Sequence, residues 1–258
     1  MNSGPGSLAF DFDGVLCNGL REYFQTSWRV YRQTWPVSNT EPPEGLASRF
    51  NRLRPVVEVG WEMPVVLRAV IQGFSDADIL SRWPHIRQQL VQSEDLSIES
   101  IGQLVDATRD HCILHELDDW LDLHEFYPGV IQQLQQLQQN NIPFVIVTTK
   151  ESRFVHRLLG RAGIVLGNDQ IFGKDCKRPK PKTLRLLKTS LPLPIWFIED
   201  RIAALKAVQA ESDLQDIQLF LADWGYNIAR DRKEADQSDA MTCLSLGKFQ
   251  QSLADWVS

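Results

Sequence analysis

Short apolar runs alternate with helix-like stretches along the second half of the chain, and this alternation strongly constrains the fold. The run Ile142–Thr149 is continuously apolar and rich in β-branched residues, as buried parallel strands are. Further strand-like runs end at Asp200, at Asp223 and near Leu244, and amphipathic patterns that predict helices separate them. The alternation predicts an α/β fold, in which helices cover both faces of a mostly parallel sheet to make three α/β/α layers.

The segment from residue 18 to residue 126 has a different pattern, because apolar positions recur there at helical spacing and no strand is evident. One predicted helix begins after Ser75, a suitable N-cap residue that is followed three positions later by Asp78. We therefore predict an all-α domain over residues 18–126. It is inserted after the first strand of an α/β core that comprises residues 1–17 and 127–258.

Charge and composition argue against some classes of partner. The chain has 258 residues, of which 43% are hydrophobic and 23% charged, as in ordinary soluble proteins. Its net charge of −6 argues against nucleic acid, and no apolar run approaches the roughly 20 residues that span a bilayer. The N-terminal residues lack the basic and apolar regions of a secretory signal, so we expect a cytoplasmic protein. Its cysteines make no CxxC pair and are expected to be free thiols: Cys17, Cys112, Cys176 and Cys243.

Polar side chains gather where three of the predicted strands end. These carboxylates and hydroxyls are Asp11 and Asp13, Thr148 and Thr149, and Glu199 and Asp200. In open α/β sheets, ligands bind beyond the carboxyl ends of the strands. We therefore expect these groups to converge at one edge of the sheet, together with a lysine from the basic segment 174–182.

This set of groups suits phosphoryl transfer. Several carboxylates can hold a hard divalent cation such as Mg²⁺, which prefers oxygen ligands and offsets the negative charge of a phosphate. One aspartate can then form a phospho-aspartate, and a second one, two residues on along an extended chain, points to the same side and can act as acid and base. A threonine hydroxyl can bind a phosphate oxygen, and a lysine can neutralise the charge that develops.

Four segments, in order, resemble the motifs of the haloacid dehalogenase-like (HAD) hydrolases. They are DFDGVL at residues 11–16, VIVTTK at 145–150, KRPKPKTL at 177–184 and WFIEDR at 196–201. The segment FYPGVIQQLQQL also resembles the place where chains of this family return from a helical cap. The resemblance covers nearly the whole chain. It implies a Rossmann-like core and an all-α helical cap domain formed by residues 18–126.

The resemblance implies roles for the matching residues. Asp11 would be the nucleophile, and Asp13 would be the general acid and base, with its backbone carbonyl on the metal. Asp200 and Glu199 would complete the Mg²⁺ site with Asp11, and Thr148 would bind the phosphoryl group. Family members with dehalogenase activity lack the second aspartate of the first motif. The presence of Asp13 therefore favours phosphate chemistry.

The third motif contains more than one basic residue. The family pattern places a lysine before a proline, and this segment contains Lys177, Arg178 and Lys180. We expect Lys180 to fill the catalytic role, because KPK followed by a helix is a spacing that the family tolerates and arginine is not interchangeable with lysine. Thr149, Arg178 and Gly14 are expected to contribute to phosphate binding, and Gly14 also lets the chain turn sharply.

Some residues outside these motifs admit two interpretations. His111 and His115 have a metal-ligand spacing on a predicted helix, but no third ligand is evident, and an exposed helix face is the favoured interpretation. Trp61, Glu62 and Arg54 either line a substrate pocket or belong to the packing and the surface of the helical domain.

The predicted function is a Mg²⁺-dependent phosphatase that hydrolyses a small-molecule phosphate monoester through a phospho-aspartate intermediate, similar to the phosphoglycolate phosphatases. A phosphomutase of the β-phosphoglucomutase type would use the same motifs. A catalytically weak HAD-fold protein with a binding or regulatory role is the third interpretation. We expect a small-molecule phosphate as the substrate, and neither nucleic acid nor a membrane as a partner.

Overall fold

The computed structural model describes residues 4–37 and 39–257, and the chain divides into two compact units. The α/β unit is formed by the residues up to Asn18 together with those from Glu125 onward, and the helical unit is Gly19–His124. Each unit is described by itself below.

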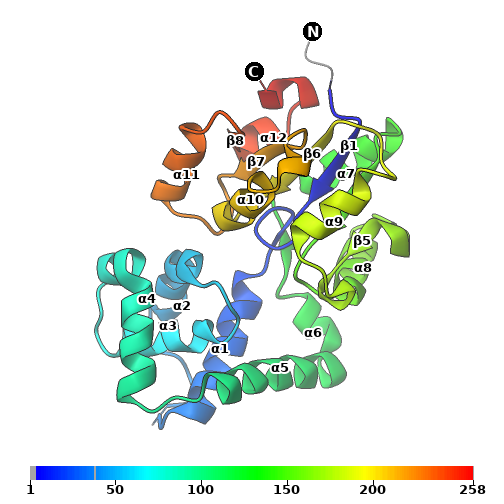
Figure 1. The fold of residues 1–258 in the computed structure, drawn as a ribbon. Coiled ribbons are helices and arrows are strands. Elements are labelled where there is room, and N and C mark those ends of the chain that lie inside the picture. Colours follow the sequence, from blue (N-terminus) through cyan, green and yellow to red (C-terminus); the bar gives the residue numbers. More distant parts are fainter. Residues whose placement is uncertain (1–3, 38, 258) are drawn as a thin grey trace. The chain divides into compact units, whose positions relative to one another are not determined.

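Six parallel strands form the main sheet of the α/β unit, in the order β5-β4-β1-β6-β7-β8 (Figure 1). The strands are β1 Ser7–Phe10, β4 Phe144–Val147, β5 Ile171–Phe172, β6 Ile195–Glu199, β7 Gln218–Ala222 and β8 Met241–Leu244. The predicted α/β fold with a mostly parallel sheet is therefore confirmed. Because β1 lies between β4 and β6, the carboxyl ends of these three strands are neighbours at one edge of the sheet.

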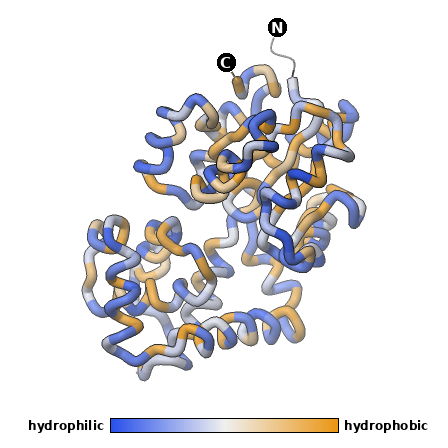
Figure 2. Tube along the Cα trace, viewed as in Figure 1, coloured by the Kyte–Doolittle hydropathy of each residue, from blue (hydrophilic) through white to orange (hydrophobic). Residues whose placement is uncertain are grey.

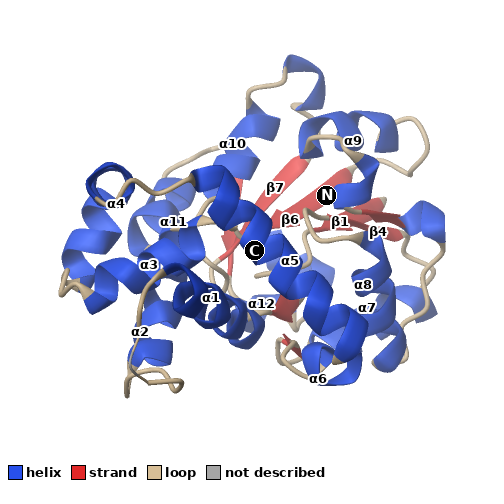
Figure 3. Ribbon diagram, turned by 90° about the horizontal axis from the view of Figure 1, so that it is seen from below, coloured by secondary structure: helices blue, strands red, loops and turns tan. Residues whose placement is uncertain are grey.

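Helices connect these strands or, in the case of α12, follow the last one, as the alternating pattern predicts. They are α7 Val130–Gln139, α8 Ser152–Arg161, α9 Lys180–Leu187, α10 Ile202–Gln209, α11 Ala229–Asp236 and α12 Leu246–Phe249. Figure 3 shows helices on both sides of the sheet. The α8 helix ends as its sequence suggests, since Gly163 follows it with a φ of +79°, a conformation that favours glycine.

The two faces of the sheet bury different side chains, because successive residues of a strand point to opposite sides. Ala9 of β1 packs on one face in a core that includes Leu184 of α9 and Leu205 of α10. Its neighbour Phe10 contacts Phe249 of α12, with the two ring centroids 6.2 Å apart. Complete burial of such side chains contributes about 1.5–3 kcal/mol each, so β1 is held firmly from both sides.

The sequence pattern misses three very short strands. One is β5, which has only two residues, and the others are β2 (Cys17–Asn18) and β3 (Glu125–Phe126), which pair antiparallel in a separate sheet. A strand of two residues shows no alternation, so its sequence carries no signal of period two. The β2–β3 pair belongs to the α/β unit and lies where the chain leaves for the helical unit and returns.

The helical unit contains α1 Leu20–Thr34, α2 Leu46–Leu53, α3 Glu62–Ile71, α4 Asp76–Ser93, α5 Ile98–His115 and α6 Leu117–Leu121. The predicted cap at Ser75 is present, because its side-chain Oγ accepts a hydrogen bond from the backbone N–H of Asp78 at 3.1 Å. The α4 helix is kinked at Arg82, two residues before Pro84. Within the described part of the chain, no helix is both long and apolar enough to cross a membrane.

Candidate active site

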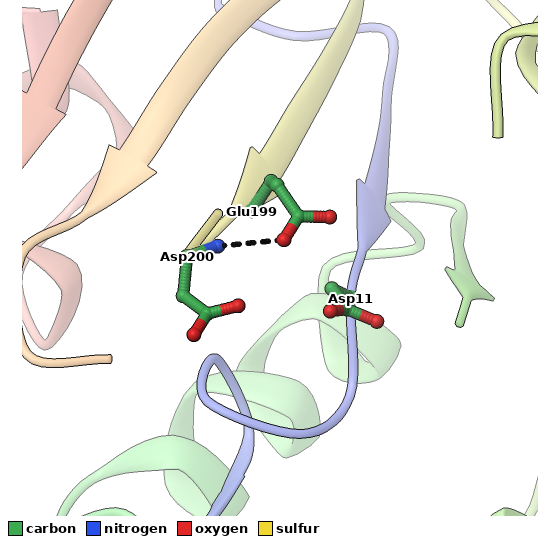
Figure 4. A group of neighbouring side chains, drawn as sticks. All are labelled: Asp11, Glu199 and Asp200. Carbon is green, nitrogen blue, oxygen red and sulfur yellow. Dashed lines mark hydrogen bonds between the residues drawn. The ribbon is translucent and has the colours of Figure 1, made fainter. Parts of the chain in front are cut away.

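Three buried carboxylates meet at the carboxyl edge of the sheet. Asp11 follows β1, Glu199 ends β6, and Asp200 follows it directly. Figure 4 shows their side chains pointing toward one another, and one oxygen from each lies within 4.8 Å of the others. All three side chains are almost inaccessible to solvent, with Asp11 only 6% exposed. The strands thus bring together the acidic residues that the sequence places far apart.

Lys180 supplies positive charge to this acidic cluster. It is the first residue of α9, and its Nζ lies 3.0 Å from Asp11 Oδ1 and 2.5 Å from Glu199 Oε2. Lys177 and Arg178, the other basic residues of the third motif, are exposed in the loop that precedes α9. The structure therefore brings Lys180 to the carboxylates and leaves the other two on the surface.

The two oxygens of Glu199 are already engaged by the protein. Its Oε1 accepts hydrogen bonds from the backbone N–H groups of Asp200 and Arg201, at 3.1 and 2.9 Å, while Oε2 contacts Lys180. In contrast, Asp200 Oδ1 is buried and accepts no hydrogen bond, and Asp11 Oδ1 is buried with the Lys180 ammonium 3.0 Å away. A buried carboxylate oxygen without a donor is costly, so Asp200 Oδ1 is the atom that would gain most from a bound cation.

The pKa values reflect this crowding of charge. Burial raises the pKa of Asp11 to about 7, although Lys180 acts in the opposite direction, and Glu199 raises it further. Burial and the charge of Asp11 raise the pKa of Asp200 to about 6. Burial also raises the pKa of Glu199. The pKa of Lys180 is raised, because the two carboxylates outweigh the effect of burial, so this side chain stays protonated.

The carboxylate of Asp200 is fixed by close packing against glycine. Its Oδ2 accepts a hydrogen bond of 2.6 Å from the backbone N–H of Tyr226. A Cβ atom on Gly14 would lie 2.2 Å from the same oxygen, and one on Gly225 would lie 2.3 Å from Asp200 Cβ. Gly14 also has a φ of +89°, which favours glycine. The predicted sharp turn at Gly14 is therefore present, and it leaves room for Asp200.

Asp13 lies apart from the acidic cluster and faces another lysine. Both of its carboxylate oxygens accept hydrogen bonds from Lys150 Nζ, at 3.1 and 3.3 Å. Lys150 follows the second motif directly and is only 9% exposed. Lys150 is the last residue of the segment VIVTTK, but the sequence alone indicates no role for it. The only signal in the sequence is its position, two residues after Thr148.

The hydroxyls of the second motif lie in different environments. Thr148 is buried, and its Oγ1 accepts a hydrogen bond of 3.2 Å from the backbone N–H of Lys150. Thr149 is exposed. Thr148 therefore shares a turn with the lysine that holds Asp13, whereas Thr149 is free to face solvent.

Two groups of residues outside the motifs lie in the helical unit. Glu62 is fully buried in the helical unit, where it forms an ion pair with Arg87 and accepts a hydrogen bond of 3.2 Å from Trp83. Trp61 and Glu62 also border a cavity of about 490 Å³ within that unit. His111 and His115 lie on an exposed face of α5, with their ring centroids 4.5 Å apart. The metal-binding groups found among the described residues do not include this pair.

Comparison with known proteins identifies relatives of this chain. The sequence pattern of the haloacid dehalogenase-like hydrolases matches residues 7–210. A phosphoglycolate phosphatase from Aliivibrio fischeri is 28% identical over 148 residues, which cover 55% of this chain and 62% of that protein. The alignment therefore spans less than two thirds of this relative.

Solved structures share the fold at low sequence identity. A predicted phosphoglycolate phosphatase from Haemophilus somnus has a TM-score of 0.56 at 15% identity, covering 93% of this chain and 95% of that one. A haloacid dehalogenase-like family protein from Streptococcus pneumoniae has a TM-score of 0.56 at 17% identity, covering 95% of both chains. Protein Tyrosine Kinase A from Mycobacterium tuberculosis has a TM-score of 0.55 at 14% identity, covering 98% and 97%.

Proposed function

Since the chain belongs to the haloacid dehalogenase-like hydrolase family, we propose that it is a metal-dependent phosphatase that uses Asp11 as its nucleophile. The observation that carries the proposal is the buried acidic cluster, in which Asp200 Oδ1 has no donor and Asp11 Oδ1 shares the ammonium of Lys180 with Glu199. A structural role alone would not call for three buried carboxylates beside one lysine. A bound cation would satisfy the lone pairs of the carboxylate oxygens and offset their charge, and it would in turn bind a phosphate group.

The donor set fits a magnesium ion. Asp11 and Asp200 would hold it through carboxylate oxygen, the ligand that Mg²⁺ prefers. The backbone carbonyl of Asp13 would be a third ligand. We propose that Glu199 positions Lys180, because its two oxygens are occupied. When bound, the metal ion would offset the repulsion between the phosphate and the attacking carboxylate.

The residues of the chain would divide the chemistry in the following way. The Asp11 carboxylate attacks phosphorus, and the bond from phosphorus to the leaving oxygen breaks while that oxygen takes a proton from Asp13. Asp13 then accepts a proton from the water that attacks phosphorus and releases Asp11 and inorganic phosphate. Thr148 donates a hydrogen bond to the phosphoryl group, and Lys180 offsets the charge at Asp11.

We further propose that the helical unit acts as a cap that reads the leaving group and limits access of water during the reaction. Its place in the sequence supports this role. It begins at Gly19, only six residues after Asp13, and the chain enters and leaves it through the β2–β3 pair.

The test is hydrolysis of a panel of metabolite phosphates, phosphoglycolate and sugar phosphates included, with and without Mg²⁺. We expect steady release of inorganic phosphate that chelation abolishes and that the substitution Asp11→Asn eliminates. Asp223→Asn is the matched control, because Asp223 also follows a parallel strand but lies outside the acidic cluster. Isomerised sugar phosphate without phosphate release would support the mutase instead. Full activity of Asp11→Asn would contradict the proposed nucleophile.

A further inference from the structure

The stretch from Lys150 to Lys188 has a charge opposite to that of the rest of the chain. It contains 11 of the 27 Lys and Arg residues but only 3 of the 33 Asp and Glu residues, a net charge of +8 in a chain of net −6. The remaining residues therefore have a net charge of −14. In Figure 2 the loop before α9 is strongly hydrophilic, as its sequence KDCKRP implies. Such a concentration of one sign creates a local positive potential on an acidic protein.

The basic loop before α9 lies at the carboxyl edge of the sheet. It follows the parallel strand β5, as the segment at Lys150 follows β4. The two segments are joined by hydrogen bonds. The backbone N–H of Lys174 donates to the Lys150 carbonyl at 2.9 Å, and that of Ser152 donates to Asp175 at 2.8 Å. The loop thus lies beside the lysine that holds Asp13 and leads directly into Lys180.

Four exposed cations lie in this loop and in the first turn of α9. We call them the cation row: Lys174, Lys177, Arg178 and Lys182. Across the described residues, none of the four forms an ion pair. The acids nearby are engaged elsewhere, since Glu151 pairs with Arg153 and Asp175 binds Ser152. By contrast, Arg185 and Lys188, further along α9, are paired with carboxylates.

We propose that the cation row is a steering surface that draws anionic phosphate substrates toward the acidic cluster. This inference rests on the proposed phosphatase function. A phosphate dianion is repelled both by the net negative charge of the chain and by the buried carboxylates that must act on it. Unpaired cations on the segment that leads into Lys180 would offset that repulsion, and such fields raise association rates and local concentration. A substrate with a second anionic group benefits more than one with a neutral tail.

The test compares kcat/KM at low and high ionic strength, with phosphoglycolate and p-nitrophenyl phosphate as substrates. Between about 0.01 M and about 0.3 M salt, the Debye length shortens from about 30 Å to below 10 Å, which screens steering. We expect the triple variant Lys174→Gln, Lys177→Gln and Lys182→Gln to lower kcat/KM about tenfold at low salt. We also expect kcat to stay within about twofold and most of the salt dependence to disappear. The fall in kcat/KM should be larger for phosphoglycolate, which has a carboxylate, than for p-nitrophenyl phosphate.

The control removes the same charge from the opposite edge of the sheet. Lys188, Lys206 and Lys233 lie at the C-terminal ends of α9, α10 and α11, which run antiparallel to the strands that they connect. Their triple glutamine variant should keep the wild-type salt dependence and kcat/KM. Equal kcat/KM in the cation-row variant and the wild type at low salt would overturn the steering role while leaving the phosphatase proposal intact. A wild type without phosphatase activity would overturn both.

Discussion

Glu22 in the helical unit and Asp11 in the α/β unit are both buried carboxylates, yet their oxygens have different surroundings. Glu22 is 1% exposed, and Arg109 donates to both of its oxygens, at 2.8 and 3.1 Å. Thr26 adds a third donor at 2.8 Å. Asp11 is buried almost as deeply, but its Oδ1 faces the ammonium of Lys180 at 3.0 Å, and that ammonium also pairs with Glu199. Asp200, the third carboxylate of the cluster, has an oxygen without a donor.

This difference separates a structural carboxylate from a reactive one. A buried acid that accepts hydrogen bonds from an arginine on both oxygens and from a hydroxyl has its charge and its lone pairs satisfied within the protein. Such a residue stabilises the packing of helices and has no need of a ligand. The acidic cluster at Asp11 has three carboxylates, one lysine and an oxygen without a donor, and in our proposal a bound cation would balance its remaining charge. Depth of burial alone would not distinguish the two sites. The count of donors on each oxygen does.

The largest expected effect is on catalysis by the Asp11→Asn variant. We expect phosphatase activity to fall by about 10³-fold or more, because the amide cannot attack phosphorus. The same change at the completed site, Glu22→Gln, should leave kcat within about threefold at a temperature where the variant is folded, because Glu22 touches no reacting group. Both variants are compared by phosphate release. Equal losses of phosphatase activity in the two variants would contradict the proposed difference between the two sites.

The next largest effect on the reaction rate is expected from the substitution Gly14→Ala. A Cβ atom there would overlap Asp200 Oδ2 at a φ of +89°, so Asp200 must move, and misplacement by about 1 Å can cost about 10²-fold in rate. Gly163→Ala is the control in the same unit, since Gly163 has a φ of +79° but no atom within 4 Å of an added Cβ. It should cost only about 1 kcal/mol of stability, with no change in kcat. Denaturant unfolding and steady-state kinetics separate the two effects.

Replacing the two carboxylates by amides should change the free energy of unfolding in opposite directions. Glu22→Gln leaves Arg109 without its ionic partner, and because that arginine is 25% exposed we expect a loss of about 2 kcal/mol in the free energy of unfolding. Asp11→Asn removes excess charge from the acidic cluster and should stabilise the metal-free protein. Urea unfolding in the presence of a chelator measures both. A stabilised Glu22→Gln protein would contradict this account.

The smallest effect is a dependence of stability on pH. In the folded metal-free protein the pKa of Asp11 is about 7 and that of Asp200 about 6, whereas both titrate near 4 when unfolded. A raised folded-state pKa stabilises the protein below the unfolded pKa, and this contribution is lost as the pH rises through the folded value. We expect the free energy of unfolding to fall between about pH 5 and about pH 8. The loss should be smaller in Asp11→Asn. Identical pH profiles would show that these carboxylates do not titrate in this range.

The sequence was sufficient to predict the edge of the sheet where the acidic cluster lies. Asp11, Thr148 and Asp200 each follow an apolar run, and parallel strands bring their carboxyl ends to one edge. The start of a helix decides which basic residue enters the site, since Lys180 begins α9 and Arg178 remains in the exposed loop. No local pattern predicts the contact between Lys150 and Asp13, because it joins residues 137 positions apart.

The sequence also could not distinguish the carboxylates by their surroundings. Glu199 and Asp200 are adjacent acids at the end of one strand, and the sequence predicts metal binding for both. Their alternating directions send Glu199 to Lys180 and to backbone N–H groups, while Asp200 retains an oxygen without a donor. That difference arises from the positions of donors on other segments of the chain.

The central claim is that the phosphoryl group is transferred to Asp11, and trapping that intermediate tests it most directly. The Asp13→Asn variant is mixed with p-nitrophenyl phosphate and Mg²⁺, quenched in acid and analysed by peptide mass spectrometry. The activated leaving group needs no proton, so the first step proceeds, while loss of the base slows hydrolysis and the phospho-enzyme accumulates. We predict one phosphoryl group on the peptide that contains Asp11, and none in the double variant Asp11→Asn, Asp13→Asn. A phosphoryl group on any other peptide, or one that persists in the double variant, would contradict the claim.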